Sequence, residues 1–235
     1  MINEVDFQEI SMSERISKIA DFISSAKEYP DIKHYFIDGQ HRSGNNFWNI
    51  VFRNNIKVPE HKLFGESFHN PKLYQIDGIY GSLENVFNII PFRDPWEATK
   101  SFLVLTNKED YASYEDIYSY LNTCEQFYDT IIKKEKNIIP IEIGFGSSNT
   151  KQIIYSVLSL DKNDTYTSFE DLNIKEENSL RQNHTPLKNK NKEDLIKKAE
   201  DQMNDSRVIV HAAEVSRKYY TAKLIARRYW EDRGI

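Results

Sequence analysis

Short apolar runs alternate with helical stripes along this chain. Three runs have the length and the β-branched or aromatic content of buried strands: HYFID (34–38), VFNIIPF (86–92) and NIIPIEI (137–143). Pro91 cannot donate a hydrogen bond to a neighbouring strand, but it lies near the end of its run, where a proline is tolerated. The pattern therefore predicts three buried strands.

Apolar residues spaced three and four positions apart predict helices around these strands. The predicted helices cover residues 11–28, 43–55, 94–105, 114–134, 147–160, 192–204 and 208–232. Ser11 with Glu14 is typical of a capping box, and Asp94 before Pro95 is typical of an N-cap followed by the first helical residue. Residues 161–191 are polar and irregular, which predicts a long loop.

Strands that alternate with helices favour an α/β fold, in which helices cover both faces of a mainly parallel sheet. Ligands of such sheets bind beyond the carboxyl ends of the strands. The polar stretch after the first predicted strand, GQHRSGNN (39–46), therefore lies where a ligand is expected.

Composition narrows the class of protein. The chain has 235 residues, of which 39% are hydrophobic and 29% charged, and this composition is typical of a folded domain. The net charge of −5 argues against a dedicated nucleic-acid binder. The acidic stretch 1–14 lacks the apolar core of a signal peptide, and no apolar run approaches the roughly 18 residues of a membrane helix. We therefore expect a cytoplasmic protein that binds neither nucleic acid nor a membrane.

Cysteine and histidine give little sign of chemistry. Cys124 is the only cysteine, so neither an internal disulfide nor a cysteine-rich zinc site can form. It lies in the apolar stripe of the predicted helix 114–134, which favours a small core residue over a reactive thiol. The six histidines lack the spacing of metal ligands, so no metal is expected.

The first candidate motif is the polar stretch after the first predicted strand. Gly39 and Gly44 are separated by four residues, as in a phosphate-binding P-loop, and Arg42 adds a permanent cation between them. Nucleoside triphosphate P-loops continue with a lysine and a Ser or Thr that holds Mg²⁺, whereas this chain has Asn45 and Asn46. The loop therefore suits a phosphate-like group that is bound without Mg²⁺. An ordinary strand–turn–helix junction is the alternative interpretation.

The second candidate motif follows the second predicted strand. Arg93 stands at the end of that strand, and Ser101 follows eight residues later in the next predicted helix. The two could converge on a second phosphate, to which the arginine would donate charge-assisted hydrogen bonds. Alternatively, Arg93 pairs with Asp94 or Glu97 at the surface.

The two motifs together resemble those of sulfotransferases that use 3′-phosphoadenosine 5′-phosphosulfate (PAPS). The loop of that family for the 5′-phosphosulfate reads roughly Lys/Arg-Ser-Gly-Thr-Thr-Trp, and the matching residues here are Arg42, Ser43, Gly44, Asn45, Asn46 and Phe47. Its motif for the 3′-phosphate is Arg-Asp/Asn-Pro with a serine eight residues after the arginine, and the match here is Arg93, Asp94, Pro95 and Ser101. The resemblance covers about residues 33–160.

This resemblance implies a three-layer P-loop-type fold, with a single domain over residues 1–235. Beyond the core, residues 161–191 would form a lid-like loop and residues 192–232 the closing helices. PAPS would be the donor, without a metal, and a hydroxyl of a glycan or small molecule would be the acceptor. The sequence does not indicate an oligomeric state.

The resemblance also implies catalytic roles. Arg42 would neutralise the charge that builds on the bridging oxygen. His69, which precedes Arg93 by 24 residues, would be the general base, because a neutral imidazole suits that role near pH 7. Glu66 is the alternative base.

Some positions depart from the family pattern. Asn45 and Asn46 replace a threonine pair, and Phe47 replaces a tryptophan, so its ring either stacks on adenine or belongs to the core. The family's later Arg-Lys-Gly segment has no clear match; the best candidate is the basic stretch 180–192, where Arg181 would reach a phosphate. A P-loop kinase of small molecules and a non-catalytic nucleotide-binding module of the same fold stay as alternative hypotheses.

Overall fold

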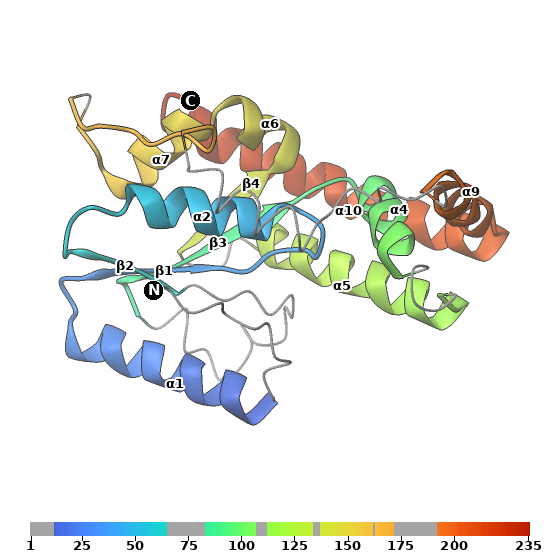
Figure 1. Ribbon diagram of the computed structural model, residues 1–235, viewed down its shortest axis with the longest axis horizontal. Helices are drawn as coiled ribbons and strands as arrows, with labels where there is room; N and C mark the ends of the chain where they lie inside the picture. Colours follow the sequence, from blue (N-terminus) through green and yellow to red (C-terminus); the bar gives the residue numbers. More distant parts are fainter. Residues whose placement is uncertain (1–11, 65–82, 107–111, 134–136, 162, 172–191) are drawn as a thin grey trace.

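A four-stranded parallel sheet forms the centre of the protein (Figure 1). The computed structural model describes residues 12–64, 83–106, 112–133, 137–161, 163–171 and 192–235. In these residues the strand order is β2-β1-β3-β4, and the strands span β1 Lys33–Ile37, β2 His61–Phe64, β3 Val86–Phe92 and β4 Ile138–Glu142. The predicted α/β class and the parallel sheet are therefore confirmed.

Helices cover both faces of the sheet. They span α1 Met12–Glu28, α2 Asn45–Asn55, α4 Pro95–Thr106, α5 Tyr114–Ile132, α6 Ile143–Ser148, α7 Thr150–Leu158, α9 Lys192–Met203 and α10 Ser206–Glu231. Figure 1 shows α1 on one face and α2 with α7 on the other, while α5 and α10 lie side by side. No helix among these residues is long and apolar enough to cross a membrane.

Two buried clusters correspond to the two faces, because successive side chains of a strand point in opposite directions. Phe36 of β1 belongs to the cluster that α1, α4, α5 and most of α10 complete. Its neighbours Tyr35 and Ile37 belong to the other cluster, with α2, α7 and Trp230 near the end of α10. The strands β1 and β3 have partners on both sides and helices on both faces, so they read as nearly continuous apolar runs.

The helix predictions hold with small changes at the ends. Asp94 is the N-cap of α4, since its Oδ1 accepts hydrogen bonds from the backbone N–H groups of Trp96 and Glu97. The predicted helix 147–160 is instead two helices, α6 and α7, which meet at Asn149. Ser11 lies outside the described residues, as does most of the predicted loop 161–191; its described residues, 161 and 163–171, have no helix or strand.

The edge strand β2 was not predicted. Its four residues, HKLF, are only partly buried or exposed, so they form no continuous apolar run. They are paired with β1 in parallel, with Lys33 opposite His61 and Phe36 opposite Phe64. A short edge strand of this kind is specified by its neighbour rather than by its own hydrophobicity.

Candidate functional site

The candidate site lies where β1 and β3 end side by side. β1 leads through α2 to β2 on one side of it, and β3 leads through α4 and α5 to β4 on the other side. The chain connections therefore diverge between β1 and β3, and open parallel sheets bind ligands at such a topological switch point. Both sequence motifs follow these two strands, so the fold brings them to the same edge.

The loop after β1 runs so close to β3 that it needs glycine. A Cβ atom on Gly39 would lie 2.1 Å from the carbonyl oxygen of Pro91, which no side chain can tolerate. Further along, Arg42 has φ 66° and Gly44 has φ 84°, both in the left-handed region. Arg42 is therefore held in a conformation that non-glycine residues seldom adopt, as happens at functional sites.

Asn45 closes this loop with its side chain. Its Oδ1 accepts a hydrogen bond from the backbone N–H of Gly39 at 2.9 Å, and its Nδ2 donates to the carbonyl oxygens of Gly39 and Gln40, each at 3.1 Å. The side chain is only 3% exposed. Both donors of this amide therefore point into the loop, whereas the resemblance implies a place for this residue at the 5′-phosphosulfate.

Ser43 anchors the same loop to β3. Its hydroxyl lies within hydrogen-bonding distance of the carbonyl oxygens of Gln40 and, at 2.7 Å, Pro91, and the residue is fully buried. Its backbone N–H donates to the Gln40 carbonyl at 3.1 Å. The hydroxyl thus faces the interior of the protein rather than a ligand at the surface.

Gln40 is a site residue that the sequence analysis missed. Its fully buried side chain accepts hydrogen bonds at Oε1 from the Arg93 backbone N–H at 3.0 Å and from the Tyr128 hydroxyl at 3.2 Å. Its Nε2 contacts Cys124 Sγ at 3.1 Å. Nothing in the local sequence distinguishes this glutamine from an exposed loop residue, because its partners lie in distant segments.

Three residues of the two motifs meet directly. The Nε of Arg42 donates to Ser101 Oγ at 3.0 Å, and Nη1 of Arg93 donates to the carbonyl oxygen of Arg42 at 3.3 Å. Arg93 also forms a long ion pair with Glu97, in which Nη2 and Oε2 are 3.8 Å apart. The surface pairing that we considered for Arg93 therefore exists, but it accompanies the contact between the motifs.

The electrostatic setting of this edge favours an anion. Burial lowers the pKa of Arg42, the nearby Tyr120 raises it, and the charge of Arg93 lowers it again. A guanidinium stays protonated in spite of such shifts, so two positive charges are held close together. The helix α2 starts here as well, with Gly44 at its N-cap and therefore no side-chain cap, and it adds partial positive charge.

Phe47, in the first turn of α2, has two aromatic neighbours. Phe47 packs edge-on against Trp48, with centroids 5.3 Å apart, and against Phe169 at 5.1 Å. Of the two roles considered for Phe47, the structure favours the core.

His41 is held by its backbone, since its carbonyl oxygen accepts a hydrogen bond from the Tyr120 hydroxyl at 2.7 Å.

Glu142, at the carboxyl end of β4, was also missed. Its Oε2 accepts a hydrogen bond from the Phe145 backbone N–H at 2.9 Å and thereby caps α6. Its Oε1 accepts from the Tyr219 hydroxyl at 3.0 Å and lies 3.6 Å from Lys223 Nζ. Burial and this carboxylate raise the pKa of Tyr219, which therefore stays a neutral donor. Glu142 thus links α6 to α10.

Several sequence predictions are not placed by the structure. The candidate bases His69 and Glu66 and the candidate phosphate ligand Arg181 lie outside the described residues. Within the described ranges no group of His, Cys, Asp and Glu could hold a metal. Cys124 is fully buried, and burial raises its pKa to about 12, so its prediction as a core residue is confirmed.

No protein family, no curated protein and no solved structure matches the chain.

Proposed function

We propose that this chain is a sulfotransferase that moves a sulfuryl group from PAPS to a hydroxyl of a glycan or small molecule. The observation that supports it is the meeting of the Arg42 loop with Arg93 and Ser101 at the ends of two neighbouring strands. The two motifs are 51 residues apart between their arginines, yet they share hydrogen bonds. Such a pair of clusters would select a ligand that has an anionic group at each of its two ends.

The residues present fit the proposed donor. The two guanidinium groups are half-buried, and their positive charges lie close together. An anion bound between or beside them would therefore lower the free energy of the protein. The planar guanidinium also matches the oxygen geometry of a phosphate, to which it donates charge-assisted hydrogen bonds. The first turn of α2 adds backbone N–H groups on the same side.

We assign each residue a role in this proposal. PAPS, when bound, would supply the sulfuryl group. Arg42 would hold permanent positive charge beside the 5′ end of the nucleotide, where negative charge increases in the transition state. Arg93 and Ser101 would hold the 3′-phosphate. Asn45 would act indirectly, by keeping the loop closed around Gly39.

The kinase hypothesis has less support. In a nucleoside triphosphate P-loop, a lysine follows the second glycine and reaches the β and γ phosphates. Here the residue after Gly44 is Asn45, which is neutral and is used for loop closure. A non-catalytic module would use the same binding residues, so turnover separates it from an enzyme.

A thermal-shift titration with adenosine 3′,5′-bisphosphate tests the proposal. We expect it to raise the melting temperature of the wild type equally with Mg²⁺ and with EDTA, because binding to the folded state stabilises it. Arg93→Ala should weaken binding about tenfold or more, since a charge-assisted hydrogen bond contributes about 1.5–3 kcal/mol. Arg53→Ala is the matched control, because Arg53 is exposed in the last turn of α2.

Each outcome separates the hypotheses. No shift in the wild type removes the sulfotransferase proposal. A shift with ATP that requires Mg²⁺ supports the kinase instead. Binding of the bisphosphate together with no sulfuryl transfer to a panel of hydroxylated acceptors supports the non-catalytic module.

A further inference from the structure

A buried glutamine connects the two halves of the candidate site. The backbone carbonyl of Gln40 belongs to the loop that carries Arg42, where it accepts hydrogen bonds from the Ser43 N–H and the Asn45 side chain. Its side chain reaches the other half, where Oε1 accepts from the Arg93 N–H at 3.0 Å. One residue thus supports both arginines.

Tyr128 of α5 reinforces this connection. Its hydroxyl lies 2.7 Å from the carbonyl oxygen of Arg93 and 3.2 Å from Gln40 Oε1, so it can donate to either. Gln40 and Tyr128 together hold the backbone of Arg93 at both its N–H and its carbonyl. Burial raises the pKa of Tyr128 well above its ordinary value, so the hydroxyl keeps its proton.

These contacts set the position of Arg93 relative to Arg42 and do not themselves bind a ligand. Gln40 is fully buried, and the described contacts use both oxygen and nitrogen of its amide, so its conformation is tightly constrained. A change there would alter where Arg93 stands relative to Arg42. A ligand that contacts one arginine would tolerate such a shift, whereas a ligand that must reach both would lose affinity.

We infer that Gln40, supported by Tyr128, is a positioning residue that sets the separation of the two arginine clusters and so selects nucleotides phosphorylated at both ends. This inference rests on the proposed function. It adds a specificity determinant that does not itself touch the nucleotide.

Affinities for three nucleotides test it, measured by calorimetry on the full chain: adenosine 3′,5′-bisphosphate, adenosine 5′-monophosphate and adenosine 3′-monophosphate. We expect Gln40→Met to weaken the bisphosphate about tenfold and each monophosphate by less than about twofold, since coupled contacts are worth about 0.5–3 kcal/mol. Tyr128→Phe should give the same pattern at about threefold, because it removes one of the two supports.

Matched substitutions on the surface serve as controls. Gln152→Met on α7 and Tyr118→Phe on α5 make the same chemical changes at exposed positions, and they should leave all three affinities unchanged. If Gln40→Met does not fold, Tyr128→Phe carries the test.

Two results would overturn the inference alone: an equal loss for all three nucleotides in either variant, or no loss in a folded variant. A wild type that binds the bisphosphate no tighter than the monophosphates contradicts the proposed function itself, and the inference falls with it. The two failures are therefore distinguishable from the wild-type data.

Discussion

Side-chain amides form hydrogen bonds with the backbone at both ends of the strands. We call the end of the sheet where the strands begin the amino edge and the end where they finish the carboxyl edge. At the amino edge, Asn85 donates at 2.9 to 3.1 Å to the carbonyl oxygens of Ala26, Tyr29 and Ile32. At the carboxyl edge, Asn45 donates to two carbonyl oxygens of its own loop, and Gln40 accepts a hydrogen bond from the Arg93 backbone N–H. Side-chain amides therefore stabilise backbone structure at both edges and do not by themselves indicate a ligand.

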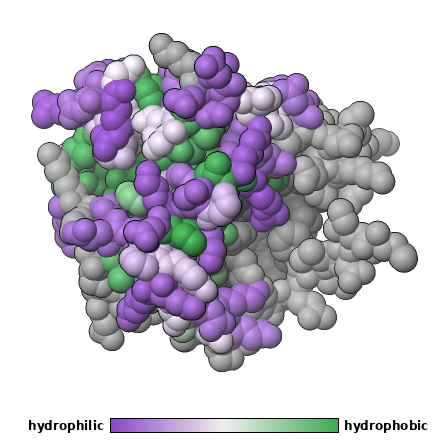
Figure 2. Space-filling model, turned by 90° about the vertical axis from the view of Figure 1, so that its left-hand side faces the viewer, coloured by the Kyte–Doolittle hydropathy of each residue, from purple (hydrophilic) through white to green (hydrophobic). Residues whose placement is uncertain are grey.

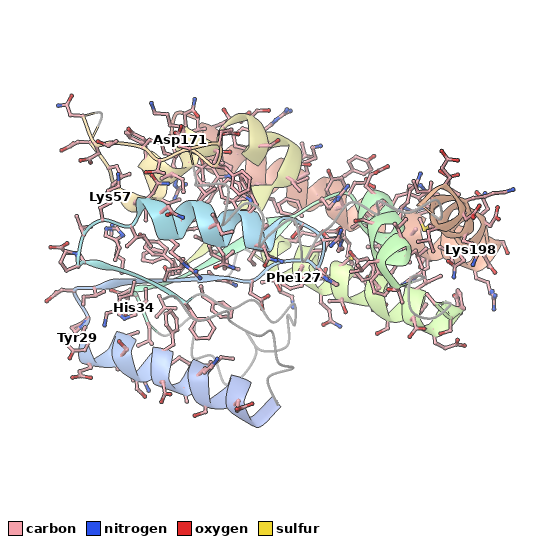
Figure 3. All side chains as sticks on the ribbon, in the orientation of Figure 1. Tyr29, His34, Lys57, Phe127, Asp171 and Lys198 are labelled. Atoms are coloured by element: carbon pink, nitrogen blue, oxygen red, sulfur yellow. The ribbon has the colours of Figure 1, made fainter. Side chains whose placement is uncertain are left out.

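The edges differ in the basic side chains that they bury. The amino edge holds His34 and His61, whose pKa values are lowered first by burial, so they tend to be neutral. The carboxyl edge holds Arg42 and Arg93, which stay charged. Figure 3 shows His34 near the start of β1 and Phe127 towards the opposite end of the sheet. The candidate site is thus distinguished by two arginines whose hydrogen bonds join the two motifs.

The surface of the amino edge carries both polar and apolar residues. Figure 2 views the molecule from the side where the strands begin, and polar and apolar residues alternate there without a large patch of one kind. A pocket of about 540 Å³ opens between the end of α1 and the start of β3, lined in part by Lys27, Lys33 and Glu84. Its lining carries both basic and acidic side chains.

We expect the greatest loss of stability from a substitution at Gly39, in the loop at the carboxyl edge. Gly39→Ala would place a Cβ against the Pro91 carbonyl, so we expect the free energy of unfolding to fall by about 3 kcal/mol. Urea denaturation measures it. The control is Gly234→Ala: the φ of 75° at this glycine is unfavourable for alanine, but no atom lies within 4 Å of the added Cβ, so the loss should be about 1 kcal/mol or less. Equal losses at the two glycines would contradict the close approach of the loop to β3.

Asparagine variants at the two edges test whether the ligand binds at the carboxyl edge alone. Asn45→Ala should cost about 2 kcal/mol and Asn85→Ala about 1 kcal/mol, because Asn45 is buried and Asn85 is partly exposed. Both losses are measured by urea denaturation. Only Asn45→Ala should also weaken binding of adenosine 3′,5′-bisphosphate. If Asn85→Ala weakens that binding equally, the assignment of the site to the carboxyl edge is wrong.

The amino edge should make the protein sensitive to acid. The folded-state pKa values of His34 and His61 lie below the ordinary value of about 6.5, so the unfolded chain binds more protons as pH falls. Stability should therefore be fully present above about pH 6.5 and decrease as pH falls through that value. Melting temperatures between pH 7.5 and 5.5 measure this, and the double variant His34→Gln/His61→Gln should show a flatter dependence. An unchanged slope in that variant would show that other groups are responsible.

The smallest expected effect is at Cys124. This thiol lies beneath the candidate site, in contact with Gln40, and burial holds its pKa at about 12. A thiol reagent at pH 7.5 should not label the native protein but should label it fully in urea, because the thiolate is the reactive form. Mass spectrometry reads the adduct. Rapid labelling of the native protein would show that this part of the core is open.

The sequence predicted much of the fold because its main signals are local. The runs that became β1, β3 and β4 and the stripes that became the long helices needed no knowledge of distant residues. The short edge strand β2 lacked such a signal, since its pairing with β1 specifies it.

The candidate site was predicted only in part. The arginines and Ser101 were found from motif spacing, and the structure brings them together. The inward direction of Asn45 and the bridge made by Gln40 depend on contacts with the loop backbone, β3 and α5, which a one-dimensional pattern does not contain. The side chains of Ser43 and Asn45 therefore hold the loop itself, and the roles of the two arginines in binding stay predictions.

A crystal structure with adenosine 3′,5′-bisphosphate would show whether one ligand joins the two motifs. We expect a single nucleotide that bridges them, with its 5′-phosphate at the Arg42 loop and its 3′-phosphate at Arg93 and Ser101. A nucleotide bound with either phosphate away from these residues would contradict this expectation.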